Sequence, residues 1–522
     1  MNRSGFLSDT PDSTAETTPP SPNPGVAQPG PHSFSHHLPA SDGHYQRVCG
    51  YIEDDPVAAY EWASPDAYEA FLDMKFGIRV VWGVYSCIQL QNESWPFLEM
   101  SLGERQAYQD LYKSWYPAGF DAEEWVDFFA ESGAKMFAFT TKHHDGFSMY
   151  DTKTRIRRRP NWLAPGGPVI EDCDIAYSIM ETPFKRDVVK ELTEAAHKKG
   201  LKTDLYFSHP DWYDADFRPY NFHPLQVPGA GKIAAVGKDL HPEMEHPEKR
   251  FGKSGLAVVP DPGPAEVDRM MKRHRAQLEE LITGYGNVDM VCLDQWLGPQ
   301  VWPQLRETML YLRKIRPDVM YRARGIGNYG DYYTPEGFVP GNKENTDVPW
   351  FVIYPLGKSF SYDPREENYK GAAWIVRNLI DSAAKGGNFM ASIGPDGSGR
   401  FHPKAIGQLR QTGEWLRVNG KGIYGTRARD GQHWKQGDQI RFTTTKDKKH
   451  VFAFVFERPG SQLILASVRP RRGSEIRLMG IPTPLKWRYS SNRGLIIEIP
   501  EELLEKLPSS IRMAYGFEIE VS

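Results

Sequence analysis

The chain has little cysteine for its length and no cysteine motif. Its 522 residues include four cysteines, Cys49, Cys87, Cys173 and Cys292, which lie far apart and form no CxxC or CxxxC pair. Closely spaced cysteines are typical of structural zinc sites, and many cysteines in a short chain are typical of disulfide frameworks. The sequence therefore indicates neither kind of site and leaves the redox compartment open.

Long apolar runs and an excess of one charge are also missing. No apolar run approaches the roughly 18 residues that a membrane-spanning helix needs. The net charge is −4 and the pI is about 6.5, which favours neither nucleic acid nor a membrane as partner. The first residues, MNRSGFLSDT, lack the pattern of a secretory signal, so localisation stays open between the cytoplasm and secretion from a misassigned start.

Composition divides the chain into three parts. Residues 1–45 are rich in Pro, Ser, Thr, Gly and Asp, which predicts a disordered tail because so little apolar surface can be buried. From 46 to 425, short β-branched and aromatic runs alternate with amphipathic helical patterns. From 426 to 522 the helical period disappears, and short alternating runs separated by turn residues predict a β-sandwich.

The repeated strand–helix units of the middle part predict a barrel. The pattern KRDVVKELTEAAHKKG places its apolar residues on one helix face and ends at Gly200, which is typical of a helix C-cap. No GxGxxG segment follows a strand, which argues against an open dinucleotide-binding sheet. We therefore predict an α/β fold with a degenerate (β/α)8-type barrel, followed by a C-terminal antiparallel β-sandwich. The expected strands include FGIRVVWG, MFAFTT, LYF, MVCL and MYRAR.

Asp294 stands at the end of an expected strand. It directly follows the apolar run MVCL, and functional side chains of such barrels lie at the carboxyl ends of strands. A carboxylate there can act as a nucleophile. An aspartate in that position more often caps a helix or forms an ion pair, so position alone leaves these alternatives open.

A pair of histidines follows the strand MFAFTT. His143 and His144 precede Asp145 and Gly146 in TTKHHDGF. Neighbouring strand residues point to opposite sides, so both imidazoles reach one ligand only if the chain turns, which Asp145-Gly146 permits. Imidazole donors suit sugar hydroxyls. Zinc binding is the alternative, but no third ligand stands at the usual spacing, and we predict no metal.

Seven segments, taken in order, form a pattern much more specific than any one of them. Over roughly residues 75–430 they resemble glycoside hydrolase family 29, the α-L-fucosidases. The resemblance implies a degenerate barrel with a C-terminal β-sandwich, retaining hydrolysis of terminal α-L-fucosides in glycans, and no cofactor. The segments are KFGIxxxWGxYS at 75–86, FDAEEWVDFFAESGAK at 120–135, TKHHDGF, FKRDVVKEL at 184–192, VDMVCLD, KGGNFMASIGPDGSG at 385–399 and EWLRVNGKGIYGTR at 414–427.

The resemblance also implies roles for single residues. Asp294 matches the catalytic aspartate that forms a glycosyl-enzyme intermediate, and His143 and His144 match the pair that binds sugar hydroxyls. Arg324, in YRARG, is similar to an arginine near the acid/base. The other residues expected to hold the sugar are Trp82, Glu93, Trp95, Tyr206, Trp212 and Trp296.

A retaining mechanism also needs a proton donor about 5–5.5 Å from the nucleophile. Family members take it from a T-(P/A)-E segment, which matches Glu336 in YYTPEGF, or from a later P-W-E segment. The later segment here reads DVPWFVIY, with Phe351 in place of a carboxylate. We therefore predict Glu336 as the acid/base, against the alternative of an exposed loop glutamate, and keep Glu93 in reserve.

The chain departs from the family pattern at Val81. Family members usually carry histidine there, and losing a donor to a sugar hydroxyl changes discrimination between sugars. Hydrolysis of a related α-L-glycoside, such as an α-L-galactoside, is therefore one alternative. A second alternative, favoured by Phe351, is a sugar-binding protein without catalytic activity.

The basic run RIRRRP at 155–160 is the one feature that suggests nucleic acid. It is short, lies in an insertion of a slightly acidic chain and has no interleaved aromatic residues. We therefore expect a solvated loop there and no nucleic-acid partner.

Overall fold

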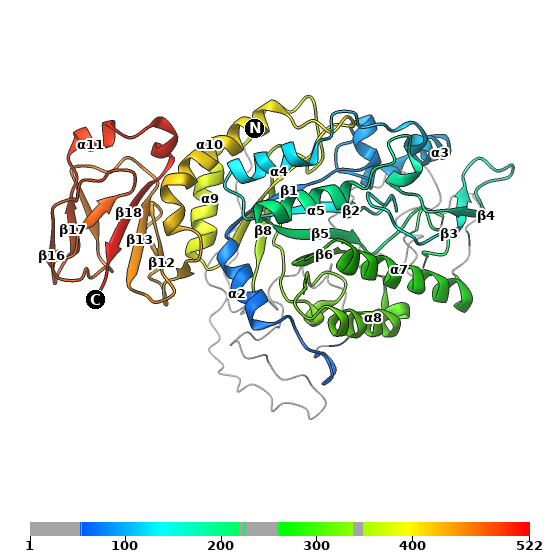
Figure 1. Ribbon diagram of the computed structural model, residues 1–522, viewed down its shortest axis with the longest axis horizontal. Coiled ribbons are helices and arrows are strands. Elements are labelled where there is room, and N and C mark those ends of the chain that lie inside the picture. The colour runs from blue at the N-terminus through cyan, green and yellow to red at the C-terminus, as the bar shows by residue number, and fades with distance from the viewer. Residues whose placement is uncertain are drawn as a thin grey trace, which may run out of the picture.

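The structure, a computed structural model, describes residues 53, 55–218, 223–225, 259, 262–295, 297–337 and 348–522. The predicted tail, residues 1–45, lies outside them. In Figure 1 a sheet surrounded by helices forms the larger part of the molecule, and a second part, built mainly of β-strands, lies beyond α9 and α10 at one end. Among the described residues, no helix combines the length and apolarity that would let it cross a membrane.

The larger part is built on a seven-stranded parallel sheet in the order β7-β6-β5-β2-β1-β9-β8. Its two outer strands, β7 and β8, are joined through residues 332–336, which form parallel bridges from Tyr332 to Arg322 and from Glu336 to Ile353. This segment occupies the place of an eighth strand, which confirms the degenerate (β/α)8-type barrel. The strands are β1 Phe76–Val80, β2 Met136–Lys142, β5 Lys202–Ser208, β6 Met290–Asp294, β7 Met320–Tyr321, β8 Phe351–Pro355 and β9 Asn388–Ile393.

The strands are apolar because both of their faces are buried. Ile78 and Val80 of β1 belong to the main hydrophobic core, to which the surrounding helices also contribute. On the inside, side chains at the first residues of several strands pack against α2 (Pro65–Met74), which covers that end of the barrel. This inner cluster includes Met136, Met290, Met320, Phe351 and Met390 from the strands, and Tyr68, Phe71 and Met74 from α2.

The helices carry the expected end signals. Asp121 and Asp187 cap α4 and α5 by accepting hydrogen bonds from backbone N–H groups of the first turn. Gly200 ends α5 in the left-handed conformation, as predicted from its position. The helices around the barrel are α3 Leu102–Asp110, α4 Ala122–Glu131, α5 Val188–Lys199, α7 Pro264–Gly284, α8 Trp302–Ile315, α9 Ala372–Ala384 and α10 Pro403–Asn419.

The C-terminal part consists of two antiparallel sheets around a separate core, which confirms the β-sandwich. One sheet has the order β10-β12-β13-β18-β15, with β11 beside β12, and the other has the order β14-β17-β16. Leu465 and Ile497 of the second sheet share a core with Phe517 of the first. The elements are β10 Arg427–Ala428, β11 Lys435–Gln436, β12 Ile440–Thr444, β13 His450–Val455, β14 Gln462–Leu465, β15 Ile476–Leu478, β16 Trp487–Ser490, β17 Gly494–Glu498, α11 Glu501–Glu505 and β18 Tyr515–Glu520.

The basic run at 155–160 is not a solvated loop, so that expectation was wrong. It forms β3 (Ile156–Asn161), which pairs antiparallel with β4 (Val169–Ile175). Arg159 lies 2.6 Å from the Glu171 carboxylate and Arg155 lies 2.8 Å from that of Asp174. These carboxylates offset the basic charge, so the run offers no unopposed basic surface.

Candidate active site

Asp294 is the last residue of β6, and its side chain is only 10% exposed. Its Oδ1 atom accepts hydrogen bonds from Arg322 Nη2 at 2.6 Å and from Arg324 Nη1 at 2.9 Å. Its Oδ2 atom accepts one from the Tyr206 hydroxyl at 2.6 Å. Burial alone raises the pKa of this carboxyl, but the two guanidinium groups outweigh burial and hold the pKa well below its ordinary value. Asp294 is therefore a fixed, ionised carboxylate.

The structure brings both predicted histidines to Asp294. The chain turns at Gly146, with φ of 85°, as the Asp145-Gly146 pair predicts, and the two imidazole rings lie 4.2 Å apart. The Nδ1 atoms of His143 and His144 bond to the hydroxyls of Ser94 at 2.5 Å and Ser208 at 2.8 Å. His144 Nε2 lies 3.9 Å from Asp294 Oδ2.

Both imidazoles are neutral in these surroundings. Burial lowers the pKa of His144 to about 3, and burial together with the neighbouring His144 lowers that of His143 well below its ordinary value. His144 Nε2 is buried and has no hydrogen-bond partner among the described residues. A neutral imidazole whose Nδ1 is held by a hydroxyl can offer Nε2 to a sugar hydroxyl.

Glu336 shares its arginine with Asp294. Its Oε1 atom accepts from Arg324 Nη2 at 2.5 Å, and the same atom lies 3.9 Å from Arg322 Nη2. Burial raises the pKa of Glu336, but Arg324 and Arg322 outweigh it and lower the pKa overall. The two carboxylates thus meet one guanidinium nitrogen at 2.6 and 3.9 Å. Because both lie close to one nitrogen, the two carboxyl groups are near enough to one another for the separation of roughly 5–5.5 Å that retaining glycosidases use.

Glu93 is a third carboxyl group in the same electrostatic neighbourhood. Burial raises its pKa to about 7, and its charge interacts with Arg79, Glu336 and Asp294. Its Oε1 atom is buried without a partner among the described residues. Its backbone is left-handed, with φ of 54°, and its N–H donates to Ser361 Oγ at 3.3 Å. Glu93 therefore releases its proton only near neutral pH.

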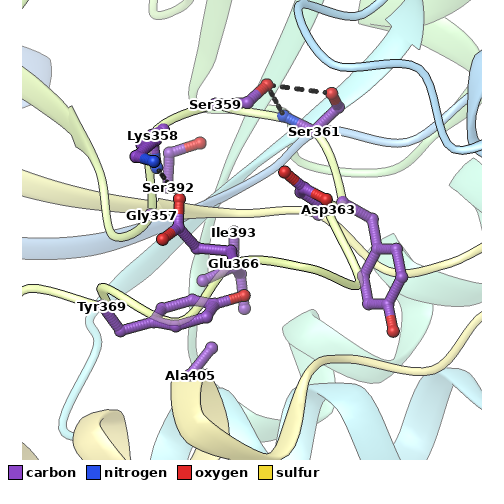
Figure 2. A pocket seen from close by; sticks show the side chains of 12 residues that line it. Gly357, Lys358, Ser359, Ser361, Asp363, Glu366, Tyr369, Ser392, Ile393 and Ala405 are labelled. Atoms are coloured by element: carbon purple, nitrogen blue, oxygen red, sulfur yellow. Dashed lines mark hydrogen bonds between the residues drawn. The ribbon is translucent and has the colours of Figure 1, made fainter.

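The loop after β8 holds the segment that carries Glu93. Figure 2 shows a small pocket under this loop, with the Ser359 and Ser361 hydroxyls joined to one another and Glu366 beside Lys358. Ser361 Oγ also donates to the Leu90 carbonyl at 2.7 Å. The pocket is lined mainly by residues of this loop. The hydrogen bonds of Ser361 connect the loop to the segment that carries Glu93.

Three of the predicted aromatic residues surround the histidines. The rings of Trp95 and Trp212 lie 4.4 and 5.4 Å from that of His144, and Tyr206 is stacked on His143 at 5.7 Å. Flat amphipathic rings beside hydrogen-bond donors are typical of sugar pockets. Trp296 lies outside the described residues.

Comparison with known proteins identifies the family. The family model for α-L-fucosidase matches residues 52–421, and the model for the α-L-fucosidase C-terminal domain matches residues 432–520. The chain belongs to the α-L-fucosidase family. It is a glycoside hydrolase with a barrel-like catalytic part and a C-terminal β part.

Individual α-L-fucosidases match most of the chain. Human plasma α-L-fucosidase is 27% identical over 470 residues, which cover 86% of this chain and 89% of that protein. A Thermotoga maritima α-fucosidase in complex with fucose has a TM-score of 0.64 at 23% identity, covering 86% of this chain and 96% of that one. A Bacteroides thetaiotaomicron family 29 enzyme, trapped as a covalent intermediate, has a TM-score of 0.66 at 19% identity, covering 88% and 97%.

Trp82, which the sequence analysis expected to hold the sugar, packs in the main core instead. Its side chain is fully buried and its Nε1 donates to the Asp396 carbonyl at 2.9 Å. Its ring packs 5.3 Å from Trp115 and 5.2 Å from Trp125 in the main core. The reason is strand alternation, since Trp82 continues the outward face of Val80.

Phe351 lies far from Asp294, so this position could not supply the proton donor of this α-L-fucosidase. It is the first residue of β8 and packs against Phe71 of α2, at the end of the barrel opposite Asp294. A carboxylate at that position would lie in an apolar cluster. The observation that favoured a sugar-binding protein without catalysis is therefore removed.

Sequence reasoning missed two further arginines at the site, Arg79 and Arg322. Arg322 donates to Asp294 and, from Nη1, to Cys292 Sγ at 2.8 Å. Arg79 lies on β1 with its guanidinium carbon 4.6 Å from the centre of the Tyr206 ring. The sequence signal that could have found Arg79 is a lone charged residue within an apolar strand, as in FGIRVVWG.

Among the described residues, no group of three or more His, Cys, Asp or Glu side chains could hold a metal ion.

Proposed function

We propose that this α-L-fucosidase removes terminal α-L-fucosyl residues from oligosaccharides or glycoconjugates by double displacement, with Asp294 as nucleophile and Glu336 as acid/base. The observation that supports this best is the carboxylate of Asp294 at a strand end, ionised by two arginines. One of them, Arg324, also binds Glu336. A retaining glycosidase needs such a pair of carboxyl groups flanking the scissile bond.

In the first step, an oxygen of Asp294 attacks the anomeric carbon while the bond to the leaving oxygen breaks. Glu336 gives its proton to that oxygen, and Asp294 becomes a glycosyl ester. In the second step, Glu336 takes a proton from water, which attacks the same carbon and releases Asp294. Tyr206 and Arg322, at 2.6 Å each, hold the carboxylate in the orientation for attack.

Arg324 suits the second step more than the first. Its contact with Glu336 favours the ionised form of this carboxyl, which is the form that accepts a proton from water. The first step needs the protonated form, so we propose that the Arg324–Glu336 contact loosens when the substrate is bound. Conversion of Asp294 to an ester then removes a negative charge and frees Arg324 to stabilise ionised Glu336.

Glu93 is a second candidate for the proton donor, because its pKa of about 7 suits an acid better than that of Glu336 does. It would act from the loop after β1, supported by Ser361. His143 and His144 would bind hydroxyls of the sugar, with Trp95 and Trp212 beside them.

Azide rescue tests the nucleophile. With an aryl α-L-fucoside, Asp294→Gly should lower kcat by about 10³-fold or more, because the intermediate cannot form. Added azide fits the space left by the carboxylate and should restore turnover, giving a glycosyl azide of inverted configuration. Unchanged kcat in Asp294→Gly would overturn the assignment.

A further inference from the structure

Arg79 is a buried charge in the floor of the active site. It belongs to β1, and its residue is 7% exposed. Its guanidinium lies over the Tyr206 ring, whose hydroxyl binds Asp294, and 5.6 Å from the ring of Phe360. Phe360 stands between Ser359 and Ser361 in the loop of Figure 2. The guanidinium therefore lies within the group of residues that surrounds the nucleophile.

This guanidinium has no acceptor in the part of the chain that the structure describes. No described residue accepts a hydrogen bond from it or lies within ion-pair distance, and its Nε is buried without a partner. Two other buried arginines show the contrast: Arg105 donates to three carbonyl groups and Arg313 binds Asp331. Burial lowers the pKa of Arg79, but Cys292, Tyr206 and Glu336 outweigh burial and raise it, so the group is charged. A ligand that accepted hydrogen bonds from this charged group would supply the acceptors that the described residues do not.

Among the residues that the structure describes, positive charge exceeds negative charge around Asp294 below about pH 7. Arg79, Arg322 and Arg324 face two carboxyl groups with lowered pKa, Asp294 and Glu336. Burial raises the pKa values of two further described carboxyls, Glu93 and Asp204, to about 7, so these groups are protonated in mildly acidic solution. Such an excess opposes the positive charge that develops on the sugar in the transition state. A negative charge on the substrate would offset it.

Fucose itself presents a methyl group at C6 and neutral hydroxyls, and supplies no such charge. We propose that the glycosyl residue this site accepts best carries an anionic oxygen substituent, a carboxylate or a sulfate ester, which binds the guanidinium of Arg79. The planar fork of a guanidinium matches both groups through paired N–H donors. The inference rests on the proposed function, since it concerns the sugar that Asp294 attacks.

Comparison of substrates with the wild-type protein tests the inference first. The substrates are aryl α-L-fucoside, aryl α-L-galactoside, the aryl α-L-galacturonide with a C6 carboxylate, and sulfate monoesters of the fucoside. We expect kcat/KM for the carboxylate or for one sulfate ester to exceed that for the fucoside by about 100-fold, because a buried charge gains its partner. The anionic substrate with the higher kcat/KM, the galacturonide or a sulfate ester, shows whether the site prefers a carboxylate or a sulfate. Equal or faster hydrolysis of a neutral substrate overturns the proposal.

Variants at Arg79 then locate the effect. The preference for the anionic substrate is the ratio of its kcat/KM to that of the fucoside. Arg79→Met should lower this ratio by about 100-fold, whereas Arg79→Lys should lower it less because the positive charge remains. An unchanged ratio in Arg79→Met overturns the proposal, and if that variant does not fold, the wild-type comparison decides. Fucoside hydrolysis that depends on Asp294 without anionic preference refutes this inference alone. Absence of Asp294-dependent hydrolysis of every substrate refutes the proposed function as well.

Discussion

At the scale of single residues, the charge of Asp294 is set by groups from β5 and from the end of β7, the two strands that flank β6. Tyr206 comes from β5, and Arg322 and Arg324 follow β7. Asp294 thus keeps its charge inside a buried site, which a nucleophile requires, while burial keeps Glu93 in the same region protonated up to about pH 7. Asp294 and Glu93 therefore differ in protonation state below about pH 7, whereas Glu336, the proposed acid/base, has a lowered pKa in the free site.

Leaving-group dependence distinguishes Glu336 from Glu93 as proton donor. Glu336→Gln should reduce kcat/KM for a glycan by about 10²–10⁴-fold, but much less for an aryl fucoside whose leaving group needs no proton. Hydrolysis rates on both substrates measure this. Glu93→Gln is the matched variant and should affect the two substrates alike. If Glu93→Gln shows the selective loss and Glu336→Gln does not, the roles are exchanged.

Glu93 should also make stability depend on pH. The folded protein keeps its proton up to about pH 7, whereas the unfolded chain releases it near 4.5. The stabilisation is therefore complete below pH 4.5 and is lost as pH rises through 7, a change of about 3 kcal/mol in the free energy of unfolding. Denaturant unfolding at pH 5 and pH 8 measures it. Glu93→Gln cannot titrate, so an identical pH dependence in both proteins would contradict the raised pKa.

At the scale of elements, the turn after β2 sets the positions of His143 and His144. A Cβ atom at Gly146 would lie 2.0 Å from Asp211 Oδ1, and Asp211 is itself buried and bound to Arg273 at 2.7 Å. The left-handed backbone would strain another residue here, and the space for its Cβ atom is already filled. The turn ties the histidines to the buried ion pair behind them.

Gly146→Ala should consequently destabilise the protein by about 3 kcal/mol or more, through backbone strain and the clash with Asp211. Gly166→Ala is the matched control, because its φ is 89° but nothing lies within 4 Å of its Cβ position. It should cost only about 1 kcal/mol. Thermal unfolding of both variants gives the comparison, and equal losses would show that the clash is absorbed.

Elements also show which positions could be predicted from the sequence. The positions of Asp294, His143 and His144 at strand ends were predictable because they follow apolar runs, and their roles stay predictions. The location of Trp82 was not predictable, because it depends on where strand alternation ends. Arg79 was missed because its environment is formed by Tyr206 and Phe360, which lie far away in the sequence.

At the scale of the whole molecule, the barrel and the sandwich share a strand with two buried faces. On β13, Phe452 and Phe454 belong to the core of the barrel, whereas Val451 and Val455 belong to the core of the sandwich. Trp415 of α10 also donates to the Ala514 carbonyl at 2.9 Å. The alternation of β13 was readable in the sequence, but the partner of each face was not, because it depends on packing between distant segments.

We therefore expect the two parts to unfold together. Calorimetry of the full chain should give one cooperative transition, because loss of the sandwich exposes the apolar face of α9 and α10. Two resolved transitions would show that the shared contacts contribute little.

The covalent intermediate tests the central claim most directly. Incubation with 2-fluoro-fucosyl fluoride should trap a glycosyl ester, because fluorine at C2 slows its hydrolysis, and peptide mass spectrometry should locate the added mass on Asp294. Asp294→Asn should remain unlabelled. Label on another residue, or turnover without any labelled intermediate, would contradict the account.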